Sequence, residues 1–258
     1  MTLAIQTAPR EHYRLKHVVK SEVVKIVTLR STAITLGLTV AVGLLVTGLV
    51  TNAALHHGPG YYSGFDPTQA ALTGLIVAGL TGGVFGALLV TGEYSSGTIR
   101  TTLAAKIGVT AATTVVFCEL LSFVSFFLGE GILSGSGAPS ANLGSPGALR
   151  AVLMTGLFIA LMALMSFGFG LICRSTPAAI AAFVGVVFVL PLVMHGISEP
   201  DVRYLPTNIL TNSIMSTVNQ GPGGIVRPLS PALGLLLMAM YAAIAVAAGA
   251  VLFVKRDA

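Results

Sequence analysis

The sequence predicts an all-α membrane protein of one domain, residues 1–258, with six transmembrane helices and an amphipathic helix before the first of them. Hydrophobic residues make up 54% of the chain and charged residues only 9%, and the mean hydropathy is +0.89. Soluble domains normally carry about 25% charged residues. So few charges cannot cover a water-exposed surface, and most of the surface therefore has to face lipid.

Charge-free stretches define the spans, because a helix needs roughly 20 apolar residues to cross a ~30 Å hydrocarbon core. Each stretch is bounded by acidic or basic residues. The predicted spans are residues 32–55, 69–90, 108–128, 151–173, 177–197 and 231–254.

The third span contains an acidic residue, Glu119. A carboxylate at a helix centre costs ~2.5–3.5 kcal/mol on the insertion scale, and each Val, Leu or Phe contributes roughly 0.3–0.6 in return. Residues 108–128 hold eleven such apolar residues, so the segment is predicted to insert. Glu119 then lies ~16 Å along the helix, near mid-bilayer, where an ionisable group is a functional candidate. It either lines a translocation path or makes a polar contact between helices or subunits.

Two further stretches are predicted to be loops. Residues 204–226 carry no charge, but their Asn, Gln, Pro, Ser and Thr residues are too polar for lipid. We expect a long loop there, with a short helix around residues 208–218. Residues 134–147 are a loop rich in Gly, Ser, Pro and Asn.

The segment before the first span, residues 10–30, has an apolar stripe at helical spacing with lysines off it. This pattern indicates a helix in the membrane interface, with its lysines on anionic headgroups; the alternative is a solvated extension of the first span. The stripe consists of Leu15, Val19, Val23 and Ile26, and the lysines are Lys16, Lys20 and Lys25.

The distribution of basic residues predicts the orientation. One side of the membrane collects most of the lysines and arginines, whereas Arg150, Arg203 and Arg227 fall on the other side. The basic side is predicted to be cytoplasmic, which places both termini inside the cell. Because the basic residues flank apolar spans rather than one polar face, no nucleic-acid partner is expected.

No catalytic or metal-binding motif is found in the sequence. It contains no G-x-x-x-x-G-K-[ST] phosphate loop, no H-E-x-x-H and no Cys/His cluster. We therefore expect no enzymatic activity, no metal and no cofactor in this chain.

The turn after the second span, residues 92–103, carries the most informative pattern. Glu93 and Tyr94 end the apolar run, Gly97 allows a sharp turn, and Thr98 can cap a short helix through Arg100. Such a helix would offer a handle to a soluble partner. The alternative is an ordinary polar loop.

Four glycines in the second span are spaced for close helix packing. They form two overlapping G-x-x-x-G pairs, which permit close helix approach; we expect packing within the chain rather than a dimer contact. The pairs are Gly79 with Gly83 and Gly82 with Gly86.

Taken in order, several short motifs resemble the permeases of ABC-2 type exporters, particularly those of high-GC Gram-positive bacteria. The E-Y-x-x-G-T-x-R pattern follows the second span, a basic interfacial segment precedes the first, and the resemblance covers essentially the whole chain. Relatives usually have a Pro and two basic residues before the lysine that opens the third span, whereas here Ala105 is followed directly by Lys106. The other motifs are Thr28-Leu29-Arg30-Ser31, Arg174-Ser175-Thr176-Pro177-Ala178-Ala179 and Tyr204-Leu205-Pro206.

The resemblance implies a multi-pass subunit of a bacterial cell-membrane exporter. It would pair with a second permease subunit, identical or not, and bind two ATPase subunits at its cytoplasmic turns. ATP and Mg would be bound by the ATPase partner. Two other functions stay open: a carrier driven by an ion gradient through Glu119, and a membrane-embedded assembly or sensor protein.

Overall fold

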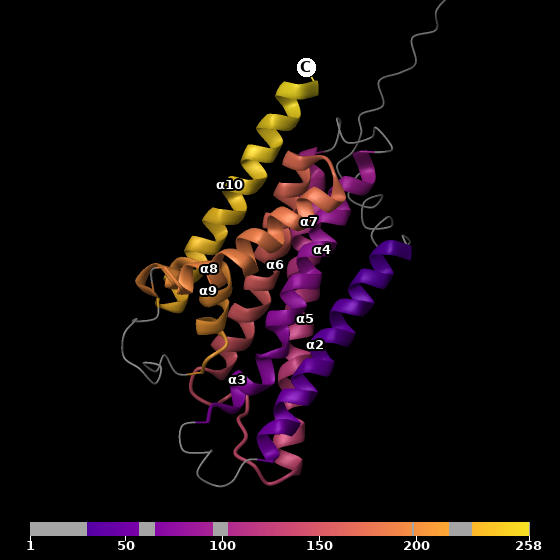
Figure 1. Cartoon of the computed structure of the whole chain (residues 1–258). Helices are drawn as coiled ribbons and strands as arrows, with labels where there is room; N and C mark the ends of the chain where they lie inside the picture. The colour runs from indigo at the N-terminus through magenta and orange to yellow at the C-terminus, as the bar shows by residue number, and fades with distance from the viewer. Residues whose placement is uncertain (1–29, 57–64, 95–102, 198, 217–228, 258) are drawn as a thin grey trace, which may run out of the picture.

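A computed structural model describes residues 30–56, 65–94, 103–197, 199–216 and 229–257 (Figure 1). The predicted interfacial helix, residues 10–30, lies outside the described residues except for Arg30, which begins the first described helix. The described residues form helices and connecting turns, without strands.

The prediction of an all-α polytopic membrane protein is confirmed. Six helical segments within the described residues are long and apolar enough to cross a membrane, at Thr32–Leu55, Pro67–Gly92, Ile107–Gly135, Ala148–Cys173, Thr176–His195 and Pro231–Phe253. The helices are α2 (Arg30–Leu55), α3 (Pro67–Leu72), α4 (Gly74–Tyr94), α5 (Leu103–Gly135), α6 (Ala148–Cys173), α7 (Thr176–Val184), η3 (Gly185–Val189), α8 (Leu190–His195), η4 (Glu199–Tyr204), α9 (Pro206–Ser213) and α10 (Pro231–Asp257).

The second span consists of two helices, α3 and α4, which meet at Thr73. Asp66 caps α3, because its Oδ1 accepts a hydrogen bond from the backbone N–H of Gln69 at 3.2 Å. Pro67 occupies the first turn, where a missing N–H removes no helical bond. At Gly74 the absence of a side chain lets α2 approach, since a Cβ there would collide with the carbonyl oxygen of Gly43.

The fifth span is irregular over its second half. A π-helical turn, η3, separates α7 from α8, and Pro191 lies in the first turn of α8. Beyond it, η4 and α9 precede α10. A short helix was predicted around residues 208–218; α9 begins and ends a few residues earlier, at Pro206 and Ser213.

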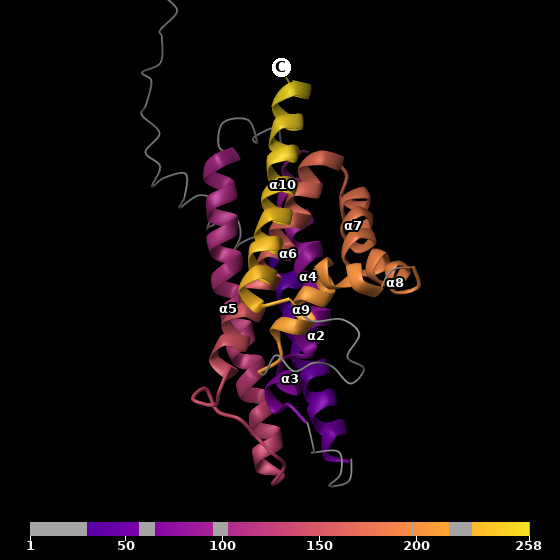
Figure 2. The same cartoon turned by 90° about the vertical axis from the view of Figure 1, so that its left-hand side faces the viewer.

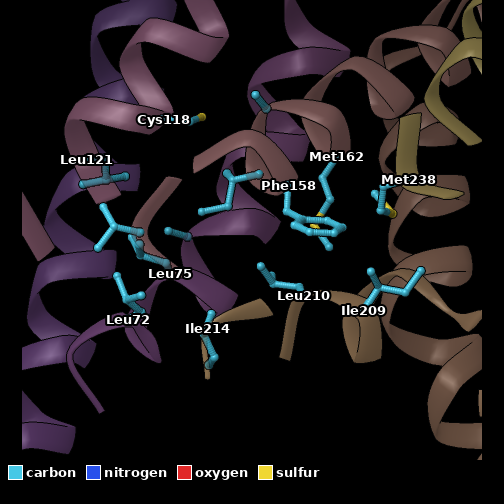
Figure 3. Close-up of a cluster of buried hydrophobic side chains, with 14 of the residues drawn as sticks. Leu72, Leu75, Cys118, Leu121, Phe158, Met162, Ile209, Leu210, Ile214 and Met238 are labelled. Atoms are coloured by element: carbon cyan, nitrogen blue, oxygen red, sulfur yellow. The ribbon is translucent and has the colours of Figure 1, made fainter. Parts of the chain in front are cut away.

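Helix α6 is the centre of the bundle. It packs against α4, α10, α5 and α7, and it is the most buried of the six spans (Figure 2). In that view α5 lies on one side of the bundle and α8 on the other, with α4, α6 and α10 between them. The core around α6 includes Leu72, Leu75, Cys118, Leu121, Phe158, Met162, Ile209, Leu210 and Met238 (Figure 3).

The two ends of the bundle differ in character. The end of α4, the turn from α6 to α7 and the end of α10 lie at one end, which we name the basic end after Arg174 and the exposed Lys255 (Figure 1). The opposite end, here the outer end, holds α3, the connection from α5 to α6 and the chain that follows α9.

Candidate functional site

The predicted coupling turn lies mostly outside the described residues. Helix α4 ends at Tyr94 and α5 begins at Leu103. Gly97, Thr98 and Arg100 fall between them, and the side chains of Glu93 and Tyr94 also lie outside the description. The structure does define the helix ends from which the turn departs.

The last turn of α4 is joined firmly to its neighbours. The hydroxyls of Thr91 and Thr176 share a hydrogen bond of 2.7 Å, which connects α4 to the start of α7. Gly170 of α6 lies directly against Val90, because a Cβ on this glycine would collide with Val90 Cγ1. A displacement of the end of α4 would therefore be passed to both α6 and α7.

Arg174 connects the turn between α6 and α7 to α10. Its backbone adopts a left-handed conformation with φ 54°, and its N–H donates to the carbonyl of Gly170 at 3.0 Å. Its guanidinium carbon lies 5.8 Å from the centroid of the Phe253 ring, within the range of a cation–π interaction. Four helices thus meet at the basic end through short-range contacts.

Glu119 packs against Gly156 of α6. A Cβ built on Gly156 would lie 2.6 Å from Glu119 Cδ and 2.7 Å from Oε2, so the carboxyl occupies the space that a side chain at 156 would need. Glu119 is half-buried, whereas Val116 and Leu120 beside it are exposed at 59% and 61%. It lies at the edge of the contact between α5 and α6. Oε2 is buried, and among the described residues it has no hydrogen-bond partner.

Two serines further along α5 also reach neighbouring helices. Ser122 donates to the carbonyl of Val152 at 2.7 Å, and Ser125 donates to the carbonyl of Ala71 at 2.9 Å. The Ser125 hydroxyl also shares a 2.7 Å hydrogen bond with Thr47 of α2. The sequence alone does not single out these residues, because a serine in a membrane helix can bond either across helices or to a carbonyl of its own helix.

The four glycines of the second span face other helices of the same chain. Gly79 and Gly82 lie near Met162 and Ile159 of α6. Gly83 lies under the ring of Phe183 in α7, with which a Cβ would collide. A Cβ on Gly86 would collide with the Ala163 carbonyl of α6.

An acidic residue near the outer end of α5, Glu130, is also held by a specific partner. The Glu130 side chain is only 6% exposed, and its Oε2 accepts a hydrogen bond from the backbone N–H of Ala141 at 2.6 Å. This bond ties the connection between α5 and α6 back to α5.

No three His, Cys, Asp or Glu side chains come together as a metal site in the part of the chain that the structure describes.

Comparison with protein-family models and with curated proteins finds no match for this chain.

Proposed function

We propose that this chain is the membrane-spanning permease subunit of an ATP-driven ABC exporter. It would be driven by a separate ATPase that contacts the turn between α4 and α5. The main support is that this turn departs from the basic end, where Thr91 and Thr176 join α4 to α7. The order of the E-Y-x-x-G-T-x-R pattern and the other short motifs in the sequence adds to it.

The packing suggests how a force on the turn would travel. Helix α4 contacts α6 through glycines, and backbone packed on backbone leaves little room for independent motion. Helix α5, on the other side of the turn, packs mainly on α6, α3 and α2 rather than on α4. At the basic end, a push on the turn would therefore move α4 together with α6 and α7.

In this proposal the basic end faces the cytoplasm, where ATP is available. Arg174 and Lys255 lie at this end, as the excess of basic residues in cytoplasmic connections requires. ATP and Mg would bind to the partner, because the sequence has no phosphate-binding loop. A second permease subunit would complete the transporter.

Co-purification tests the proposal directly. The tagged chain should bring with it an ATP-hydrolysing protein, and the complex should turn over ATP, whereas the chain alone should not. Replacing residues 95–102 by a Gly/Ser linker of equal length should remove the ATPase while leaving membrane levels unchanged. The same replacement at 136–143 in the outer connection is the matched control, and should retain the ATPase. An ATPase retained by the first variant would contradict the proposal.

A further inference from the structure

The chain that follows α9 is held from two sides at the outer end. The guanidinium of Arg150, in the first turn of α6, donates from Nη2 to the carbonyls of Met215 at 2.8 Å and Ser216 at 3.0 Å. The backbone N–H of Ser216 donates to Oδ2 of Asp66 at 2.7 Å. Charged side chains from two different spans therefore bind both backbone groups of Ser216.

The start of α6 is shaped for this contact. Gly147, the residue before α6, has φ +79°, a conformation that favours glycine. A Cβ there would collide with the carbonyl oxygen of Ser216 and lie 2.9 Å from its carbonyl carbon. Glycine at 147 thus meets two requirements, the left-handed backbone and the close approach of residue 216.

Asp66 links this contact to the second span. Its Oδ1 caps α3 through Gln69 N–H while its Oδ2 holds Ser216. Helix α3 leads through Thr73 into α4, whose far end departs into the turn of residues 95–102. Because α3 and α4 are separate helices that meet at Thr73, α3 can move relative to α6 while α4 stays packed on it. Such a movement pulls Asp66 away from a segment that Arg150 holds in place.

We propose that Asp66, Arg150 and residues 214–216 form a clasp that holds α3, the outer part of the second span, to α6, and that this clasp opens during each transport cycle. The opening step rests on the proposed function; the closed clasp does not. Opening requires only that the Asp66–Ser216 hydrogen bond break, because Arg150 keeps the segment attached to α6.

The closed clasp is tested by labelling Met215→Cys with a membrane-impermeant maleimide, in a chain where Cys118 and Cys173 are replaced by Ala. Asp66→Asn and Asp66→Ser both keep a side chain able to cap α3 but remove the acceptor for Ser216 N–H. Each should raise the labelling rate about tenfold, the change expected from loss of one charge-assisted hydrogen bond. Ser140→Cys, exposed in the other outer connection, is the control and should label at an unchanged rate. Unchanged labelling at 215 in both Asp66 variants would overturn the clasp.

The opening step is tested with Asp66→Cys/Ser216→Cys in the same background. Oxidation should join the two cysteines and abolish ATP turnover by the complex with its ATPase, and reduction should restore it. Each single-cysteine variant under oxidant is the control. A bridge that forms without affecting turnover would overturn the opening step. If the unmodified chain brings down no ATPase, the proposed function fails and the opening step with it, while the labelling result still decides the closed clasp.

Discussion

Gly86 of α4 packs against the backbone of Ala163 in α6, so that a Cβ on Gly86 would collide with the carbonyl oxygen of Ala163 and lie 2.8 Å from its carbonyl carbon. The obstacle is backbone, so no side-chain rotation can relieve it. At Gly83 the obstacle is an aromatic ring: an added Cβ would collide with the ring of Phe183 in α7. The absence of side chains at these two glycines of α4 therefore sets how closely α6 and α7 approach it.

We expect Gly86→Ala to lower the stability of the purified chain. Overpacking of a core typically costs ~1–3 kcal/mol, because helices have to separate to admit the added methyl group. The thermal midpoint in detergent should fall by several degrees. It is measured from the loss of the monodisperse peak in size-exclusion chromatography as the sample is heated. Gly92→Ala in the same helix is the matched control: nothing lies within 4 Å of its added Cβ, and Ala favours helix. Equal midpoints for the two variants would argue against the close approach of α4 to α6.

The orientation predicted from the basic residues determines which connections a reagent reaches from outside the cell. In a chain with Cys118 and Cys173 replaced, an impermeant maleimide should label Ser140→Cys and Asn212→Cys in intact cells. Ser96→Cys should be labelled only after permeabilisation, because the excess of basic residues predicts that this side faces the cytoplasm. Labelling of Ser96→Cys in intact cells would reverse the orientation.

Two substitutions in the proposed coupling turn should have effects of different size. Glu93→Ala should leave expression and insertion nearly intact, since Glu93 lies at the predicted membrane boundary, where an ion pair with a nearby basic residue would be worth only ~0–1 kcal/mol. Gly97→Val should be more damaging, because a β-branched residue resists the positive φ that a sharp turn requires.

Both variants should lower export and ATPase association together, with Gly97→Val the weaker of the two. The measurements are transport by intact cells and the amount of co-purified ATPase, each normalised to the amount of chain in the membrane. Full activity of Gly97→Val would show that the turn is an ordinary loop.

The sequence predicted the spans well because charge-free stretches are a direct physical requirement of the bilayer. The third predicted span ends at residue 128, where the run of apolar residues ends. Helix α5 continues to Gly135, and the Glu130 carboxyl is accommodated by the backbone N–H of Ala141. A bond that depends on how a loop folds back does not follow from hydropathy.

The contacts between helices were the least predictable features. A nearly uniformly apolar helix gives little indication of which face meets protein, so the bond between Ser125 and Thr47 could not be told from a hydroxyl bonded to its own helix. Asp66 and Ser216 lie 150 residues apart, and one of them acts through its backbone. Glycine spacing was a better guide, because small residues have few other reasons to recur in a membrane span.

Variants at Glu119 and Gly156 distinguish the exporter from a carrier that uses Glu119 as a proton site. Glu119→Gln keeps the shape of the side chain that fills the space beside Gly156 and removes its ability to ionise and exchange a proton. If the residue serves the contact between α5 and α6, this variant should export at a rate close to that of the unmodified chain.

Gly156→Ala is the complementary change, and it tests the contact itself. Its Cβ would lie 2.6 Å from Cδ of Glu119 and 2.9 Å from its Cα, so part of the obstacle is backbone and α5 has to move. We therefore expect a lower thermal midpoint and reduced export, although the carboxyl is retained. A proton site predicts the opposite order, with export abolished by Glu119→Gln although the amount of chain in the membrane stays normal. Export measured for the two variants side by side decides whether Glu119 contributes its shape or its proton.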